Sequence, residues 1–131
     1  MKALIYCRVS SDRQVTDGHG LDGQESHSRK FATAKGHEVE RVFRDEGISG
    51  GDFERPGMTE LLNFLERERK KGRQYVVIVD DLKRLARDVV AHFHIRKQLT
   101  SLGATIESPV HMFDESPEGK FTETVLAAGA E

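Results

Sequence analysis

The stretch Tyr75-Val76-Val77-Ile78-Val79 decides the fold class, because it is apolar throughout. A strand with one face in water alternates apolar and polar residues, whereas a strand buried on both faces does not. Continuous apolar strands are typical of parallel sheets that helices cover on both sides. The stretch therefore predicts the centre of a parallel sheet.

Glycines on either side of this strand divide the chain into repeating units. Gly36, Gly72 and Gly103 each follow a helix-like segment and precede a strand-like one, at intervals of 36 and 31 residues, about the size of a βαβ unit. Glycine just past a helix end supplies a left-handed cap. The chain therefore alternates strands and helices.

The predicted elements follow from apolar periodicity and turn residues. Strands are expected over 2–9, 37–43, 75–79 and 104–107, with an optional fifth over 110–113; helices are expected over 22–35, from Pro56, and over 83–101. The second helix has Met58, Leu61, Leu62 and Leu65 on one face, and the third has Leu85, Val89 and Phe93. We expect an α/β fold, a three-layer α/β/α sandwich with a mostly parallel central sheet of four to five strands. Its active site should lie beyond the carboxyl ends of the strands.

Composition fits one soluble domain and limits how this chain can bind nucleic acid. The 131 residues carry a formal net charge of −2, with a pI near 6.3. Free-standing DNA-binding modules are usually basic, so any nucleic-acid contact here must be local or depend on a segment outside the chain. Cys7 is the single cysteine and is expected to be buried. No apolar run approaches the ~18 residues of a membrane helix, so we expect a cytoplasmic protein.

Two groups of polar residues follow predicted strands. Arg8 and Ser10 lie at the end of the first strand and share a side, because strand side chains alternate. Arg84 and Arg87 follow the buried strand at a helix start and share a helical face. The three arginines would converge on one phosphate from two adjacent strand ends, beside a hydroxyl.

These motifs resemble the catalytic domain of the serine recombinases, the resolvase/invertase family. The first is Tyr6-Cys7-Arg8-Val9-Ser10 with Gln14, which resembles the signature that opens the domain. Four further motifs follow in the order of the family: Gly20-Leu21 through Gln24, Gly47-Ile48-Ser49-Gly50 through Arg55-Pro56-Gly57, Arg84-Leu85-Ala86-Arg87, and Gly119 followed by 126–131. The resemblance covers essentially the whole chain.

The resemblance implies a mechanism and a set of site residues. Ser10, and not Ser11, would be the nucleophile that forms a 5′-phosphoserine intermediate and frees a 3′-hydroxyl. Strands would then be exchanged and religated without ATP, metal or any other cofactor. The resemblance assigns phosphate-binding or active-site roles to Arg8, Arg55, Arg84 and Arg87, and substrate binding to Tyr6, Gln14, Gln24 and Glu131.

The partners implied are a double-stranded DNA recombination site and further copies of the same protein. The family forms dimers that pair into tetramers through a long helix, which here would begin after Gly119. We expect residues 1–131 to be the catalytic domain of a longer protein, cut at the start of that helix. The sequence-reading DNA-binding domain is expected to lie outside this chain.

One position departs from the family pattern. Many members carry an aspartate directly before the first arginine of the Arg-Leu-x-Arg motif, where this chain has Lys83. If the chain stays extended from 79 to 83, Asp81 and Lys83 point the same way. Asp81 is then the residue expected to take the place of the family's acid.

Two other interpretations use different residues. Asp80 and Asp81 at a strand end are typical of magnesium sites in metal-dependent phosphoryl-transfer enzymes. The segment 18–23 matches Gly-x-Gly-x-x-Gly, with Asp45 in the place of the ribose-binding acid, as in a non-catalytic nucleotide-binding or interaction module. The glycines of that fingerprint should directly follow the first strand, and here polar residues intervene. The recombinase interpretation accounts for more of the sequence.

Overall fold

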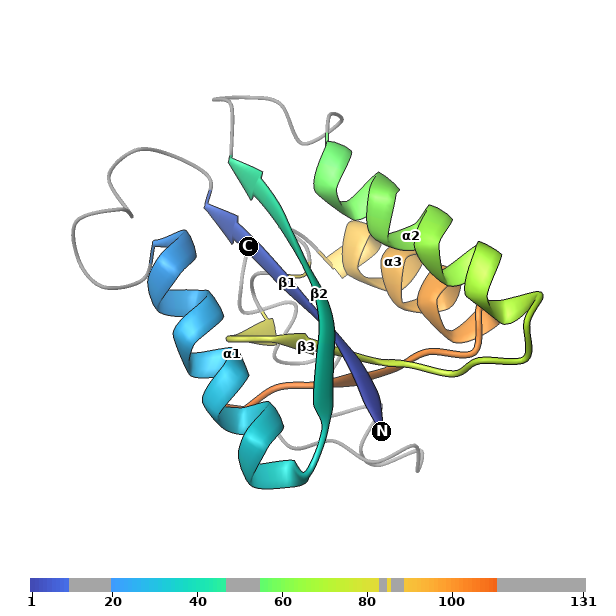
Figure 1. The fold of residues 1–131 in the computed structure, drawn as a ribbon. Coiled ribbons are helices and arrows are strands. Elements are labelled where there is room, and N and C mark those ends of the chain that lie inside the picture. Colours follow the sequence, from blue (N-terminus) through green and yellow to red (C-terminus); the bar gives the residue numbers. More distant parts are fainter. Residues whose placement is uncertain (10–19, 47–54, 83–84, 86–88, 111–131) are drawn as a thin grey trace.

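The computed structural model describes residues 1–9, 20–46, 55–82, 85 and 89–110 (Figure 1). The helices and strands in chain order are β1 (Lys2–Val9), α1 (Leu21–Lys35), β2 (Glu38–Glu46), α2 (Pro56–Arg69), β3 (Val76–Val79), α3 (Val89–Ser101) and β4 (Thr105–Glu107). This alternation confirms the predicted succession of strands and helices. None of the described helices is long and apolar enough to cross a membrane.

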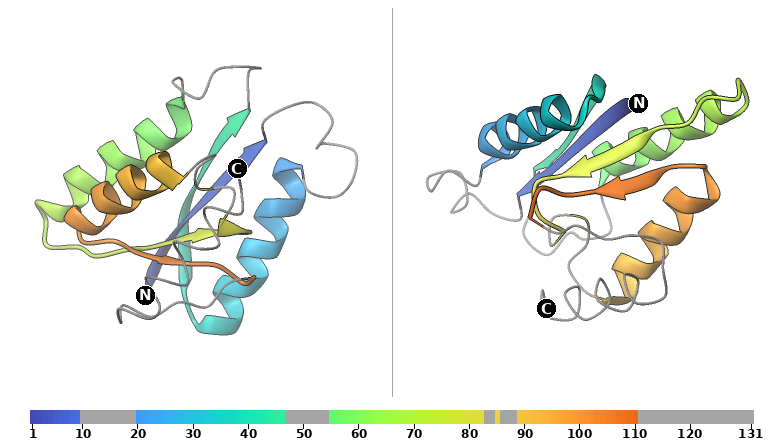
Figure 2. Two further views of the ribbon diagram at one scale, coloured as in Figure 1. Left: turned by 180° about the vertical axis from the view of Figure 1, so that it is seen from behind. Right: turned by 90° about the horizontal axis from the view of Figure 1, so that it is seen from below.

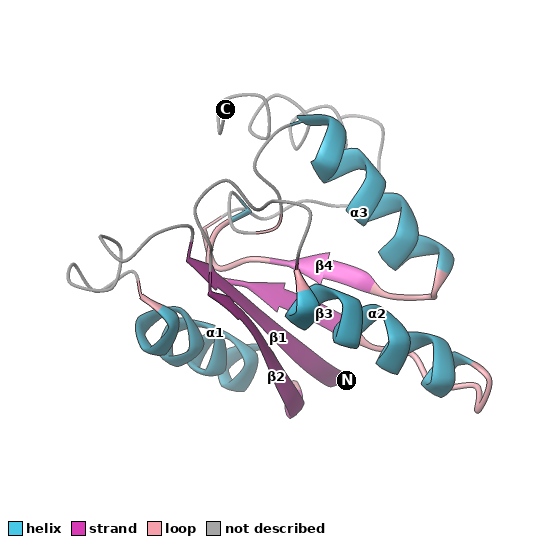
Figure 3. Cartoon of the chain, turned by 90° about the horizontal axis from the view of Figure 1, so that it is seen from above, coloured by secondary structure: helices cyan, strands magenta, loops and turns pink. Residues whose placement is uncertain are grey.

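The four strands form one parallel sheet in the order β2-β1-β3-β4. Helix α1 covers one face, and α2 and α3 cover the other, so the domain has the three predicted layers (Figure 3). The views from behind and from below show the same arrangement, with β4 beside β3 (Figure 2). Of the optional strand over 110–113, Val110 lies in a bend and the rest falls outside the described residues.

The strand order fixes where a site should lie. The chain passes from β1 to β2 on one side of the sheet, and then crosses back to β3 and β4 on the other side. In open parallel sheets, ligands bind beyond the carboxyl ends of the strands where the winding reverses. The winding reverses between β1 and β3, which are paired, with Tyr6 opposite Val79. A site is therefore expected where the carboxyl ends of these two strands meet, at one edge of the sheet.

Side-chain alternation along β1 produces two hydrophobic cores. Ala3, Ile5 and Cys7 pack on the α1 side, whereas Leu4 and Tyr6 pack on the side of α2 and α3. Burial raises the pKa of Cys7 to about 12, so the residue stays a neutral thiol. It is the buried cysteine that the sequence predicted.

Strand β3 confirms the prediction from which the fold class was drawn. Its four residues are fully buried, and they contribute alternately to the two cores. The predicted glycine caps are confirmed as well, because Gly36, Gly72 and Gly103 have φ of 77°, 77° and 80°. At Gly36 the left-handed backbone lets the amides that follow α1 bond back to its last carbonyls.

The prediction for the third helix was wrong in its start and in its buried face. Helix α3 begins at Val89, and Leu85 lies instead in a turn whose amide donates to the Leu82 carbonyl. Phe93, expected in the core, is 49% exposed. The buried face carries His92, Ile95 and Leu99. The prediction treated Leu85 as the first residue of the buried helical face, but Leu85 lies outside α3.

Candidate active site

The carboxyl end of β1 is held by a side chain from α1. The Arg8 amide donates to Oε1 of Gln24 at 2.9 Å, and Nε2 of Gln24 donates to the Arg8 carbonyl at 2.9 Å. Gln24 is fully buried. The side-chain amide of Gln24 thus bonds to both the N–H and the C=O of Arg8, as the backbone of a neighbouring strand would. Arg8 itself is half-buried, and Ser10 lies two residues further along the chain.

Half of the predicted site residues lie outside the described part of the chain. These are Ser10, Gln14, Arg84, Arg87 and Glu131; Ser11 and Lys83, which the sequence analysis compared with them, lie outside it as well. Chain connectivity nevertheless restricts where two of the segments start. Residue 10 directly follows β1, residue 80 directly follows β3, and the two strands are paired and parallel. Both segments leave the sheet at the same edge.

Arg55 and Tyr6 meet beside this edge, on the side of the sheet that α2 and α3 cover. Arg55 donates to the Tyr6 hydroxyl from Nη2 at 2.9 Å and from Nε at 3.2 Å. The same Nη2 donates to the Leu85 carbonyl at 2.6 Å. The guanidinium also lies 5.4 Å from the centre of the Tyr6 ring. Arg55 therefore joins β1 to the turn that follows β3.

A buried carboxylate completes this cluster. Asp45, at the end of β2, accepts a hydrogen bond from the Tyr6 hydroxyl at 2.6 Å. It also accepts bonds from the amides of Gly57 at 2.7 Å and Met58 at 3.0 Å. Those amides belong to the first turn of α2, where unpaired donors and the helix dipole favour an anion. Burial raises the pKa of the Tyr6 phenol well above its usual range, so it remains a donor to Asp45.

The sequence did not predict this role for Asp45. Asp45 was considered only as the acid of a nucleotide fingerprint, and its carboxylate is instead engaged by Tyr6 and the start of α2. Gly23 of the same fingerprint lies within α1. The sequence did contain a pattern that indicates this role. Asp45 stands at a strand end shortly before Arg-Pro-Gly, and an acid in that position can cap the helix that the proline begins.

The two adjacent acids after β3 differ in their surroundings. Asp80 is buried, and its Oδ1 lies 3.2 Å from Nδ1 of His27 in α1. Asp81 is half-buried. The chain bends at both residues, so the extended geometry on which the choice of Asp81 relied is not present at that position. In the described part of the chain, no three His, Cys, Asp or Glu side chains come together as a metal-binding group.

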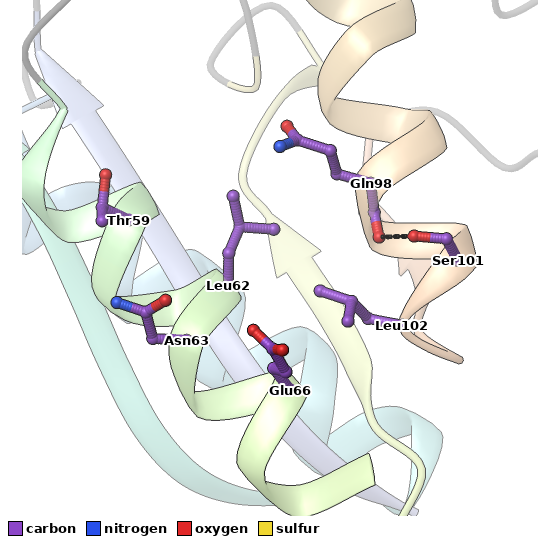
Figure 4. Close-up of a pocket in the computed structure, with 7 residues that line it drawn as sticks. All are labelled: Thr59, Leu62, Asn63, Glu66, Gln98, Ser101 and Leu102. Atoms are coloured by element: carbon purple, nitrogen blue, oxygen red, sulfur yellow. Dashed lines mark hydrogen bonds between the residues drawn. The ribbon is translucent and has the colours of Figure 1, made fainter.

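A groove elsewhere on the surface belongs to neither strand end. It measures about 470 Å³ and lies between α2 and α3 (Figure 4). Its lining residues are Thr59, Leu62, Asn63, Glu66, Gln98, Ser101 and Leu102. None of them is a predicted site residue, and the chemistry that the motifs imply is expected at the carboxyl ends of β1 and β3 instead.

Comparison with known proteins identifies the family. A model of the resolvase N-terminal domain matches residues 3–131. The chain belongs to the resolvase family. The predicted resemblance is thereby confirmed over nearly its full extent.

Solved structures of this family have the same fold. The N-terminal catalytic domain of TP901-1 integrase is 31% identical to this chain, with a TM-score of 0.77, over 96% of this chain and 91% of that one. A resolvase family site-specific recombinase from Streptococcus pneumoniae is 26% identical, with a TM-score of 0.74, over 99% and 85%. The chain is thus a serine recombinase catalytic domain.

Among curated sequences, a putative DNA recombinase of Bacillus subtilis (strain 168) is 33% identical over 116 residues. The match takes in 88% of this resolvase-family chain but 22% of the relative. An uncharacterized immunity region protein 3 of Bacillus phage phi105 is 29% identical over 63 residues, which are 48% of this chain and 77% of that protein. The chain therefore spans about a fifth of the length of the named recombinase.

Proposed function

We propose that this domain cleaves and rejoins DNA strands through a covalent intermediate on Ser10. The Ser10 Oγ attacks the scissile phosphorus as its proton is removed, and an Oγ–P bond forms. The P–O3′ bond breaks, and the leaving 3′-oxygen takes up a proton. The products are a 5′-phosphoserine linkage and a free 3′-hydroxyl. One phosphoester replaces another, so religation needs no ATP.

Arginines carry the electrostatic part of this proposal. A serine hydroxyl is a poor nucleophile unless its proton is removed and the developing charge is stabilised. Guanidinium groups stay protonated and match phosphate oxygens with paired donors. We assign this role to Arg8, Arg84 and Arg87, with Arg55 beside them. Loss of one such donor typically costs about 3 kcal/mol of transition-state stabilisation.

The observation that best supports the proposal is the pairing of Gln24 with the Arg8 backbone. It holds a cationic residue at the end of the central strand, two positions before Ser10, where the winding of the sheet reverses. We infer that Gln24 and Tyr6, which are fully buried, act by holding other residues rather than by touching DNA. Gln14 and Glu131 remain proposed substrate contacts, and Asp81 the proposed acid.

The proposed substrate is a double-stranded recombination site, held by dimers that pair into tetramers in a longer protein. With a net charge of −2, this domain has little charge to supply non-specific DNA affinity, which depends on neutralised phosphates. Other parts of the protein would supply that affinity. Because the substrate is cellular DNA, we place the protein in the cytoplasm.

The proposal is tested by covalent capture, which requires no knowledge of the target site. The full-length protein is incubated with fragmented DNA of its source genome in EDTA, and protein-linked fragments are recovered after denaturation and sequenced. We expect one enriched sequence, with protein-blocked 5′ ends and extendable 3′ ends. Cleavage that needs magnesium and leaves no linked protein would instead favour the metal-dependent interpretation with Asp80 and Asp81.

A further inference from the structure

Asp80 is a buried carboxylate at the predicted active edge for which the proposed chemistry has no use. Its side chain is 9% exposed, and it lies on the α1 side of the sheet, directly after β3. Burying a carboxylate is costly unless a partner compensates for the lost water. Within the described part of the chain, the partner that meets it is His27, at 3.2 Å. The His27 side chain is half-exposed on α1.

The described residues of the turn that follows β3, Asp80 to Leu82 and Leu85, are held at both ends. At its start, the Asp80 carboxylate meets His27, and the Asp80 carbonyl accepts a hydrogen bond from the Ser108 hydroxyl at 3.2 Å. At its end, the Leu85 carbonyl accepts the bond from Arg55. Leu85 is fully buried, and its amide bonds to the Leu82 carbonyl at 3.0 Å. The described backbone of this turn is thus fixed from α1, β4 and the start of α2.

This turn is the base of the segment that carries the proposed phosphate-binding arginines. In sequence, Arg84 falls between Leu82 and Leu85, and Arg87 follows Leu85. A small displacement of a charged donor is costly, because a misplacement of ~1 Å can lower a rate by about a hundredfold. A contact that fixes the turn therefore acts on the reaction without touching DNA.

We propose that His27 is a positioning residue, which fixes the arginine-bearing turn through Asp80. The inference rests on the proposed function, because it assigns the turn a role in strand cleavage. The pair connects α1, which also holds Arg8 through Gln24, to the segment after β3. One helix thus positions both strand ends from which the proposed catalytic residues emerge.

A second pair of the same chemistry provides a matched control. Nε2 of His37, just after α1, lies 3.0 Å from Oε1 of Glu107 at the end of β4. This pair also joins the α1 side to a strand end, and His37 is more buried than His27, with its side chain 12% exposed. Among the described residues, neither His37 nor Glu107 forms a side-chain hydrogen bond with Asp80, Leu82 or Leu85. Loss of His37 should therefore weaken the domain without moving the arginine-bearing segment.

The first measurement is amide hydrogen exchange, which does not depend on DNA. In His27→Ala, we expect exchange at the Leu85 amide to quicken by roughly a factor of ten relative to the Ile78 amide in β3. His27→Asn, which keeps a donor near the position of Nδ1, should restore the slow rate, and His37→Ala should leave the Leu85-to-Ile78 ratio unchanged. An unchanged ratio in His27→Ala would overturn the proposal.

The second measurement is the single-turnover rate of adduct formation by the full-length protein, on a duplex with the sequence recovered by capture. We expect His27→Ala to lower this rate about tenfold at saturating DNA, with little change in the DNA concentration that gives half saturation. His27→Asn should recover most of the rate, and His37→Ala should retain it. Loss of His27 in an Asp80→Asn background should cost much less than in the wild type.

The outcomes separate the two proposals. A wild-type rate in His27→Ala, with the adduct still dependent on Ser10, would overturn the positioning role and leave the proposed function intact. An adduct that persists in Ser10→Ala would refute the proposed function, whatever the amide exchange rate at Leu85. Equal losses in His27→Ala and His37→Ala would show a general structural effect and would also overturn the positioning role.

Discussion

The side-chain amide of Gln24 pairs with both backbone polar groups of Arg8. The two hydrogen bonds are 2.9 Å each, and Gln24 has no exposed surface. A side chain thus does here what an adjacent strand does elsewhere in the sheet. The contact fixes the end of β1 just before the predicted nucleophile, and it joins α1 to that strand.

Replacement of Gln24 by alanine should destabilise the domain. Two hydrogen bonds are lost, and two partly buried backbone groups are left without their partner, for a cost of about 2 to 4 kcal/mol. Urea unfolding measures the change in the free energy of unfolding. Gln98→Ala, on an exposed part of α3, is the control and should stay within about 0.5 kcal/mol of the wild type. Equal midpoints for the two variants would contradict the bracing role of Gln24.

Tyr6 and Tyr75 form a matched pair of buried hydroxyls with different expected roles. The Tyr6 hydroxyl joins Asp45 to Arg55, whereas the Tyr75 hydroxyl donates to Glu40 at 2.8 Å and lies 3.1 Å from Glu68. Each Tyr→Phe change should cost about 1 to 2 kcal/mol of stability. Only Tyr6→Phe should also slow DNA cleavage, about tenfold, because it releases Arg55.

The comparison is made on single-turnover cleavage by the full-length protein, with unfolding curves for both variants. Similar losses of stability with a loss of rate in Tyr6→Phe alone are the expected result. If Tyr75→Phe slows cleavage as much as Tyr6→Phe, the Tyr6 hydroxyl has no special role.

Gly57 leaves no room for a side chain at the start of α2. A Cβ there would overlap the Arg44 carbonyl oxygen, would lie 2.8 Å from the Arg44 carbonyl carbon and would lie 3.0 Å from Oδ1 of Asp45. The nearest atoms belong to the backbone of β2, which cannot turn away as a flexible side chain can. Gly57→Ala should therefore destabilise the domain by about 1 to 3 kcal/mol.

The same substitution should disturb the cluster around Asp45, because the Gly57 amide is one of its donors. Thermal unfolding and the amide NMR signals of Gly57 and Met58 report the two effects. Thr59→Ala, on the exposed side of the same helix, provides the comparison. A Gly57→Ala protein with the melting temperature and amide shifts of the wild type would show that α2 can move away freely.

Glu68 should make stability depend on pH in the acid range. Hydrogen bonds from Lys71, and then from Arg73 and Tyr75, lower the pKa of this carboxyl to about 2, from a usual value of 4.5. Because the folded pKa is the lower one, the carboxylate's contribution is present above about pH 4.5 and is lost as the pH falls toward 2. The stability difference between wild type and Glu68→Gln should therefore shrink over that window.

Urea unfolding from neutral pH to about pH 2 measures this difference, with Glu60→Gln on the exposed side of α2 as the control. A difference between wild type and Glu68→Gln that stays constant across the window would show that the pKa is not lowered in the folded state.

The fold was predictable because its determinants are local. The apolar run from Tyr75 to Val79 and the three glycine caps depend on neighbouring residues and on backbone geometry alone, and both predictions are confirmed. The start of α3 was not predictable from periodicity. Leu85 looks like a helix residue in sequence, but its carbonyl is held by Arg55, thirty residues earlier.

The site was predictable only in part, for the same reason. Arg8 and Arg55 are marked by motifs, and the structure places both at or near the edge of β1 and β3. The roles of Asp45 and His27 depend on partners 39 and 53 residues away, which no local pattern reveals. The nucleophile and the pair Arg84 and Arg87 lie outside the described residues and stay predictions.

The most direct test of the account replaces the two adjacent serines one at a time. Full-length Ser10→Ala, Ser11→Ala and wild-type proteins are incubated with the captured DNA in EDTA, denatured and separated on a gel. We predict a covalent protein–DNA adduct for the wild type and for Ser11→Ala, and none for a folded Ser10→Ala protein, because only Ser10 is expected to share the side of Arg8. An adduct formed by Ser10→Ala, or one lost only in Ser11→Ala, would contradict the account.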